Sequence, residues 1–259
     1  MKSKGAATFT ITQNQAIATA LLFGLTAGFG GASIAGGNPL ETVGNFFGGE
    51  DDVQRQVEVD KIDIEGEPVM GDEDANVTVV VYEDFQCPYC QRFEQGALSQ
   101  VENEYVDSGE VRIIWKDFPL PQLGHDWAVT SAETMECVYR EDNGVFWDLK
   151  DQIYSNHDVL NSMSPNAVQE EILTWASSDV NRTAVEACLD NGNPSQEVNG
   201  DLREGQSFDA QVQLPNGEER SFVSGTPGTV VYGQDDEMGE PVVGAQPYSV
   251  FQNLIESKM

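Results

Sequence analysis

The sequence predicts an α/β fold in which one layer of strands and helices is interrupted by a block of helices. The apolar, β-branched run Val77–Tyr82 is typical of a strand covered on both faces. A helix over Pro88–Val106 leads from it to a second expected strand, Val111–Asp117. Apolar residues three and four apart then predict a block of helices at His125–Arg140, Val145–Asn156, Pro165–Ser177, Arg182–Leu189 and Gln196–Gly205.

The remaining elements are short and lie at the two ends of this order. Val57–Ile64 alternates apolar and polar residues and fits an edge strand. Pro215-Asn216-Gly217 predicts the turn of a β-hairpin within residues 210–223. Short strands at Thr229–Tyr232 and Glu240–Val243, and a helix at Tyr248–Lys258, complete the predicted sheet and its cover.

Two cysteines, Cys87 and Cys90, stand where the first predicted strand turns into its helix. Pro88 suits the first helical position, which places Cys87 at the helix N-terminus. Free amides and the helix dipole stabilise an anion there, so the pKa of Cys87 should be low and its sulfur should attack first. Cys90, one turn further on, can close a disulfide with it. The pattern therefore predicts a redox-active dithiol.

A Cys-x-x-Cys pair can also be half of a zinc site. The other two cysteines, Cys137 and Cys188, stand singly and far apart, so no second pair completes such a site. We therefore expect no metal and no organic cofactor.

The charge of the chain is strongly acidic, with 13 Lys and Arg against 44 Asp and Glu and a net charge of −31. This sign excludes general nucleic-acid binding. The hydrophobic fraction of 39% and the periodic segments argue against disorder. Acidic residues spread over the whole chain indicate a surface adapted to high salt, as in halophilic proteins.

The N-terminal part divides into three expected segments. Residues 1–15 would form a cytoplasmic end, residues 16–37 are apolar for long enough to span a bilayer, and residues 38–55 form an acidic, Gly-rich linker. Lysines precede the apolar run and carboxylates follow it, which places residues 56–259 outside the cytoplasm. A signal peptide cleaved near Ser33-Ile34-Ala35 is the alternative to an uncleaved anchor.

From about Val77 to Met259, the chain resembles the DsbA-like branch of the thioredoxin fold. The matching segments are DFQCPYCQRFE (84–94), WKDFPL (115–120) with His125 after it, GTPGTVVYG (225–233) and VVGAQPYSVFQNLIE (242–256). This resemblance implies a thioredoxin-like domain over residues 56–259, with helices inserted at about 121–195 and a hairpin inserted at about 210–223. It also implies that Pro227 is cis beside the cysteine pair and that Thr226 binds an extended substrate through its backbone.

The chain departs from the family at a buried acid that often helps proton transfer at the second cysteine, because Val81 occupies that position. Glu83 follows two residues later on the same face of the strand and could replace that acid. The preferred alternative is that Glu83 is a solvated residue at the end of the strand. Asp84 is expected to support the active-site turn. Tyr89 stands where the family's strong oxidants carry histidine, so we expect Cys87 to be less acidic than in those proteins.

Cys137 and Cys188 lie on predicted helices of the insertion and would form a structural disulfide in an oxidising compartment. Two buried free thiols are the alternative. His125 is expected at a helix start and His157 on the surface, neither as a metal ligand.

The sequence thus predicts an extracytoplasmic thiol–disulfide oxidoreductase acting on exported proteins through Cys87 and Cys90. The resemblance implies a quinone-linked membrane protein as its re-oxidant. A membrane-anchored reductase of the same fold, or a binding domain with a structural cysteine pair, are the alternatives.

Overall fold

The computed structural model describes residues 56–208, 211–213, 219–222 and 225–259. The expected cytoplasmic end, membrane or signal segment and linker, residues 1–55, lie outside the described residues. Within the described ranges, none of the helices combines the length and the apolar character needed to cross a membrane.

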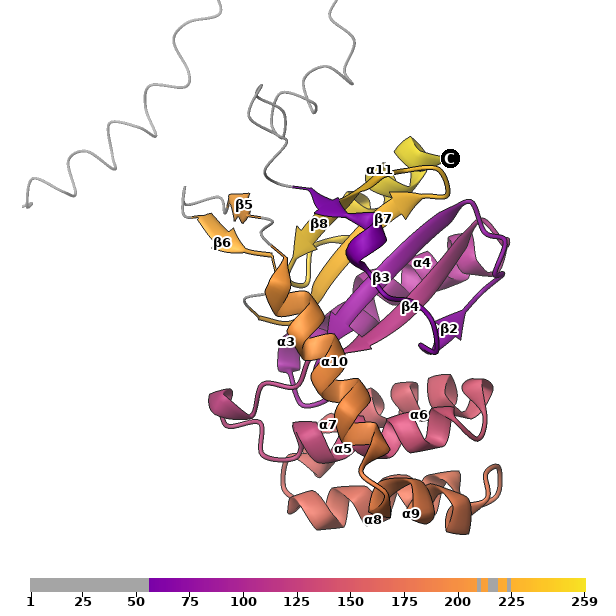
Figure 1. Ribbon diagram of the computed structural model, residues 1–259, viewed down its shortest axis with the longest axis vertical. Coiled ribbons are helices and arrows are strands. Elements are labelled where there is room, and N and C mark those ends of the chain that lie inside the picture. The colour runs from indigo at the N-terminus through magenta and orange to yellow at the C-terminus, as the bar shows by residue number, and fades with distance from the viewer. Residues whose placement is uncertain (1–55, 209–210, 214–218, 223–224) are drawn as a thin grey trace, which may run out of the picture. The chain divides into compact units, whose positions relative to one another are not determined.

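The centre of the fold is a six-stranded sheet with the order β1-β8-β7-β3-β4-β2 (Figure 1). The strands are β1 (Val57–Glu58), β2 (Val69–Met70), β3 (Val77–Glu83), β4 (Val111–Asp117), β7 (Gly228–Gly233) and β8 (Met238–Val243). Strands β3 and β4 are parallel, with Val81 opposite Trp115, and the other pairs in the sheet are antiparallel. The predicted strands at the centre of the sheet are therefore confirmed.

The connection between β3 and β4 is one continuous helix. It consists of α3 (Pro88–Phe93), the π-helical stretch η3 (Glu94–Leu98), α4 (Ser99–Val101) and a second π-helical stretch, η4 (Glu102–Val106). Alternate side chains of β3 divide between two cores, as a strand covered on both faces requires. Val79 and Val81 pack with this helix and with α11 (Tyr248–Lys258), whereas Val80 and Tyr82 face the opposite side.

The helical insertion follows β4 and contains more elements than the sequence predicts. After the short helix η5 (Pro121–Leu123), it consists of α5 (Ala128–Tyr139), α6 (Asn143–Ser155), α7 (His157–Leu160), α8 (Pro165–Ala176) and α9 (Arg182–Asp190). Helix α7, a single turn, was not predicted. Strand β2 also escaped prediction, and the expected edge strand Val57–Ile64 is wrong beyond Glu58, where the 3-10 helix η2 (Val59–Lys61) begins.

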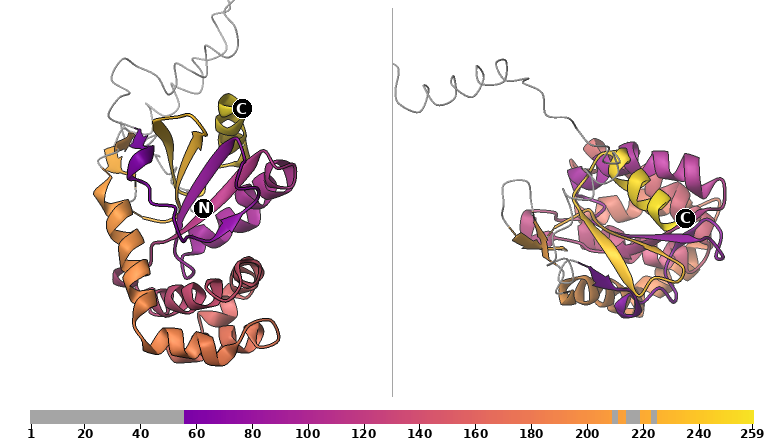
Figure 2. Two further views of the ribbon diagram at one scale, coloured as in Figure 1. Left: turned by 45° about the vertical axis from the view of Figure 1, so that its right-hand side comes forward. Right: turned by 90° about the horizontal axis from the view of Figure 1, so that it is seen from above.

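Helix α10 (Asn193–Ser207) runs from the insertion along the second face of the sheet (Figures 1 and 2). Its Gly205 is packed so closely on Phe118 that a Cβ there would lie 2.9 Å from the ring. The two strands expected for the hairpin follow, with β5 (Gln211–Gln213) antiparallel to β6 (Glu219–Ser221). Its predicted turn, Pro215-Asn216-Gly217, lies outside the described residues.

A buried lysine joins this helix to the sheet. Lys116 of β4 places its Nζ 2.7 Å from Glu67 Oε1 and 2.9 Å from Asp201 Oδ1 on α10. Asp201 Oδ2 also accepts a hydrogen bond from the Asp117 amide at 2.9 Å. Because a buried ammonium needs such partners, these contacts fix the register of α10 on the sheet.

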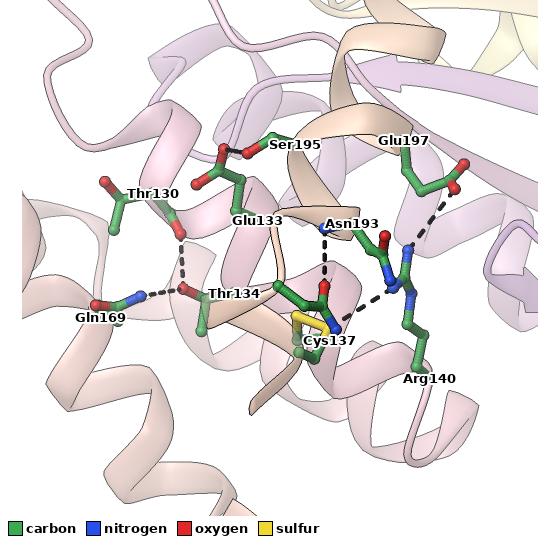
Figure 3. The surroundings of a disulfide bond; sticks show 11 residues. Thr130, Glu133, Thr134, Cys137, Arg140, Gln169, Asn193, Ser195 and Glu197 are labelled. Atoms are coloured by element: carbon green, nitrogen blue, oxygen red, sulfur yellow. Dashed lines mark hydrogen bonds and ion pairs between the residues drawn. A yellow bond between two sulfur atoms is a disulfide. The ribbon is translucent and has the colours of Figure 1, made fainter. Parts of the chain in front are cut away.

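A disulfide between Cys137 and Cys188 ties α5 to α9, with an S–S distance of 2.03 Å and a sequence separation of 51 residues (Figure 3). The alternative of two free thiols is therefore excluded for this pair. The bridge therefore links two helices within the insertion.

Candidate active site

The Cys87–Cys90 pair lies where β3 ends and α3 begins. Cys87 is the N-cap residue of α3, Pro88 is its first helical residue, and the Gln91 amide donates to the Cys87 carbonyl at 3.1 Å. Both thiols are free, and the exposed fraction is 5% for Cys87 and 0% for Cys90. The predicted attacking sulfur is thus the outer of the two.

The surroundings separate the acidities of the two thiols. A hydrogen bond from the Cys90 thiol, aided by the backbone amides of Tyr89 and Cys90 and opposed by burial, lowers the pKa of Cys87 to about 6. Burial raises the pKa of Cys90 well above its ordinary value, and the neighbouring Cys87 and Glu83 add to that rise. Near neutral pH the reduced site would therefore hold one thiolate, on Cys87.

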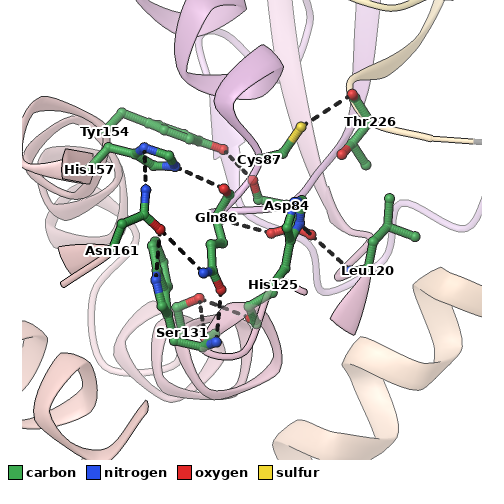
Figure 4. Close-up of polar contacts among 12 residues, drawn as sticks. Asp84, Gln86, Cys87, Leu120, His125, Ser131, Tyr154, His157, Asn161 and Thr226 are labelled. Atoms are coloured by element: carbon green, nitrogen blue, oxygen red, sulfur yellow. Dashed lines mark hydrogen bonds and ion pairs between the residues drawn. The ribbon is translucent and has the colours of Figure 1, made fainter. Parts of the chain in front are cut away.

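The cis bond that the resemblance implied is present between Thr226 and Pro227. The carbonyl oxygen of Thr226 lies 3.4 Å from Cys87 Sγ (Figure 4). Beyond it, the Pro227 carbonyl accepts a bond from the Gly244 amide at 2.8 Å. The substrate-binding role of this segment stays a prediction.

Asp84 supports the active-site turn, as predicted. Its Oδ1 accepts the Gln86 amide at 2.7 Å, and its Oδ2 accepts the Leu120 amide at 2.8 Å (Figure 4). The same Oδ2 lies 2.7 Å from His125 Nδ1, and this bond raises the pKa of His125. His125 precedes α5 as expected, but the sequence did not indicate its partner.

Glu83 is completely buried, so the preferred expectation of a solvated strand-end residue is wrong. Its side chain follows Val81 onto the face of the sheet that α3 covers, because residues two apart in a strand share a face. The Tyr154 hydroxyl donates to its Oε2 at 2.7 Å. Burial raises the pKa of Glu83 well above its ordinary value, and the charge of Glu94 adds to the rise.

Behind Glu83 lies a charged group that the sequence analysis missed. Lys150 of α6 has no exposed side-chain surface and places its Nζ 2.6 Å from Glu94 Oε2 and 3.1 Å from Glu102 Oε1. One signal was available: Glu94 and Lys150 fall on the apolar faces of their helices, where a charged side chain requires a partner. The partner itself could not be identified, because the two helices are far apart in the sequence.

His157 is 2% exposed, so the expected surface position is wrong. It begins α7 and places its Nε2 2.9 Å from the Gln86 carbonyl oxygen. No pattern in this part of the sequence indicated a helix of one turn between two longer helices.

Tyr89, in the dipeptide between the two cysteines, has an exposed fraction of 55%. The guanidinium of Arg92 lies 5.0 Å from the centre of its ring. Pro88 is also exposed. A substrate that reaches Cys87 would therefore meet this dipeptide.

No group of three or more His, Cys, Asp or Glu in the described part of the chain is arranged to hold a metal ion.

Comparison with known proteins shows which family this chain belongs to. The sequence model described as thioredoxin matches residues 63–215. The chain is 36% identical over 87 residues to the probable disulfide bond formation protein D of Bacillus cereus, covering 34% of this chain and 39% of that protein. It is 29% identical over 117 residues to disulfide bond formation protein D of Bacillus subtilis, covering 45% of this chain and 48% of that protein. The matches thus span less than half the length of these curated relatives.

Among solved structures, Wolbachia pipientis alpha-DsbA1 superposes with a TM-score of 0.59 at 16% sequence identity. The superposition covers 76% of this chain and 92% of that protein. At this identity the likeness concerns the fold, including the helical insertion. Because the family model matches more than half of the chain, the protein belongs to the thioredoxin family and has the fold of its DsbA-like branch.

Proposed function

We propose that the protein is a thiol–disulfide oxidoreductase that introduces or exchanges disulfides in exported proteins through Cys87 and Cys90. The observation that carries the proposal is the difference between the two thiols. Cys87 is 5% exposed and its pKa is lowered to about 6, whereas Cys90 is fully buried and its pKa is raised. A thiolate held at neutral pH is a good attacking and leaving group in thiol–disulfide exchange.

In the oxidase direction, a substrate thiolate attacks Cys87 Sγ of the Cys87–Cys90 disulfide. The new bond joins the substrate sulfur to Cys87, and the bond between the two cysteines breaks, releasing Cys90 as a thiolate that takes up a proton. A second substrate thiolate then attacks the mixed disulfide at the substrate sulfur. The products are an oxidised substrate and an enzyme with both cysteines reduced.

The setting proposed for this reaction follows from the sequence and the relatives. Residues 16–37 would anchor the domain of residues 56–259 outside the cytoplasm, with release after signal cleavage as the alternative. Two relatives are named disulfide bond formation protein D. The re-oxidant would be a quinone-linked membrane protein, as the family resemblance implies.

A reductase is the second candidate function, and the acidity of Cys87 is the observation that supports it. Its pKa of about 6 lies between the values of about 3.5 for DsbA and about 7 for thioredoxin. Because oxidising power rises with the stability of the reduced thiolate, an intermediate pKa fits an intermediate potential.

The reduction potential separates the two candidates. The full chain would be equilibrated with glutathione buffers at high salt, and the alkylated Cys87 and Cys90 counted by mass spectrometry. A potential of about −120 to −180 mV identifies a disulfide donor, whereas about −270 mV identifies a reductase. A pair that resists mild reductant and carries no reactive thiolate would overturn both candidates and leave a structural cysteine pair.

A further inference from the structure

The peptide group between Gln86 and Cys87 is held on both sides. Its N–H, from Cys87, donates to the Asp84 carbonyl at 2.9 Å. Its carbonyl, from Gln86, lies 2.9 Å from Nε2 of His157, the first residue of α7. A peptide plane fixed at both ends limits the backbone rotation that would turn the Cys87 sulfur away from the α3 amides.

The side chain of Gln86 is held by the same insertion. Its Oε1 accepts the Trp127 amide at 2.8 Å, and its Nε2 lies 3.2 Å from Asn161 Oδ1. Asn161 Oδ1 also accepts the indole N–H of Trp127 at 3.2 Å (Figure 4). The residue before the attacking cysteine therefore has its backbone carbonyl and both side-chain polar atoms bound to the helical insertion.

These partners assign one protonation state to His157. The Gln86 carbonyl only accepts, so His157 Nε2 must carry the hydrogen. Asn161 presents its Nδ2 to His157 Nδ1 at 3.0 Å, because its Oδ1 accepts from two groups that only donate. Nδ1 must therefore hold a lone pair, and the ring that fits this network is neutral.

Protonation of His157 would place two donors against each other at Nδ1. Turning the Asn161 amide would relieve that contact, but it would also direct Nδ2 at the two donors from Gln86 and Trp127 and break both bonds. Protonation thus costs hydrogen bonds on either path, which agrees with a lowered pKa of His157, for which burial is the main cause.

We propose that the helical insertion positions the reactive sulfur of Cys87 through Gln86, and that neutral His157 is the positioning residue that holds the connection. This proposal rests on the proposed function, since it concerns the sulfur that forms the mixed disulfide with the substrate. Loss of the His157 bond would remove one of the two bonds that hold the peptide before Cys87, which would let the sulfur move out of line with the α3 amides and destabilise the thiolate.

The test compares three variants of the full chain by the pH dependence of Cys87 alkylation, which needs no disulfide-transfer activity. His157→Leu removes the donor to Gln86. His157→Gln can still donate from its amide nitrogen but does not titrate. Gln95→Ala is the control. It removes the 3.1 Å bond from Gln95, in η3, to the Tyr154 carbonyl of the insertion. This bond also joins the helix after Cys87 to the insertion, but it does not involve Gln86.

We expect His157→Leu to raise the pKa of Cys87, with roughly tenfold weaker oxidation of a dithiol, equivalent to about 30 mV in potential. His157→Gln and Gln95→Ala should leave the pKa of Cys87 unchanged. An unshifted Cys87 in folded His157→Leu, or an equal shift in Gln95→Ala, would overturn the proposal. Failure of the proposed function would appear differently, as absent disulfide transfer in the wild type.

A second variant covers the case in which His157→Leu does not fold. Asn161→Ala keeps His157 but removes the acceptor of the Gln86 side chain and the amide that faces Nδ1 of His157, so the pKa of Cys87 should rise in this variant as well. His157→Gln should keep the wild-type alkylation curve, because its amide can still donate to the Gln86 carbonyl. An unshifted Cys87 in folded Asn161→Ala, or a raised pKa of Cys87 in His157→Gln, would contradict the proposal.

Discussion

Cys87 Sγ lies 3.4 Å from the carbonyl oxygen of Thr226, the residue that precedes the cis-proline. A carbonyl oxygen only accepts hydrogen bonds, so this contact suits the protonated thiol and not the thiolate. On ionisation the sulfur takes its hydrogen bonds from other groups, namely the Cys90 thiol, the Thr226 side chain and the amides at the start of α3. A substrate backbone that donates to the Thr226 carbonyl would replace the thiol at this oxygen.

The first prediction concerns those donors. Cys90→Ala removes the thiol whose hydrogen bond is the largest influence on the acidity of Cys87, so the pKa of Cys87 should rise from about 6 toward its ordinary value of about 8.5. The rate of iodoacetamide alkylation as a function of pH measures it. Cys90→Ser keeps a hydroxyl donor and should fall between the two proteins. An unchanged titration in Cys90→Ala would show that the helix amides suffice.

The second prediction concerns the proton that Cys90 takes up when it leaves the disulfide. Glu83 is buried next to it with a raised pKa, so this carboxyl remains protonated at a pH where an exposed glutamate is ionised. Glu83→Gln cannot supply that proton, and we expect the oxidation of a small dithiol to slow by up to about 100-fold, the lower range for general acid catalysis. Stopped-flow measurement of this step provides the test.

Its control is Glu102→Gln, which removes a carboxylate that lies 3.1 Å from Lys150 Nζ but belongs to η4, beyond Glu94. Equal rates for wild type and Glu83→Gln would exclude the role of Glu83 in proton transfer.

The elements that were predicted correctly from the sequence are those with a strong local pattern. Strand Val111–Asp117 and helix Tyr248–Lys258 were predicted with their observed bounds, because their periodicity is local and strong. The cysteine pair was likewise identifiable, since a proline and a helix start lie within four residues. Local sequence thus specified the elements and the reacting atoms.

The surroundings of those atoms could not be predicted in the same way. Asp84 contacts His125, and Glu94 contacts Lys150, across separations of 41 and 56 residues. Whether Glu83 is buried depends on α6 of the insertion, which supplies Tyr154 to it. Sequence patterns identify which side chains are out of place on an apolar face, but the packed fold determines the partners they meet.

The third prediction concerns the disulfide of the insertion. Cys137→Ala/Cys188→Ala opens a loop with a sequence separation of 51 residues and should lower the free energy of unfolding by about 4 kcal/mol on the chain-entropy model. Urea denaturation at fixed salt measures the loss. The pKa of Cys87 should stay near 6, because the bridge lies on α5 and α9 and contributes no contact to Cys87 among the described residues. A shifted Cys87 would mean that the bridge also acts on the active site.

The fourth prediction concerns pH and Glu136, which is 3% exposed on α5. Burial, with the charges of Asp117, Glu67 and Asp201, raises its pKa to about 9. Below about pH 4.5 both folded and unfolded chains hold this proton. Between that pH and about 9, only the folded chain keeps it, so unfolding releases a proton and the free energy of unfolding falls as pH rises.

Glu136→Gln removes this titration and should flatten the decline by up to about 1.4 kcal/mol per pH unit between pH 5 and 9. The variant should therefore gain stability over wild type on the alkaline side, measured by urea denaturation at several pH values. Glu141→Gln is the matched control, since it makes the same substitution at an exposed position close by. If both variants shift the curve equally, net charge governs the effect, and the buried carboxyl of Glu136 has no special share in it.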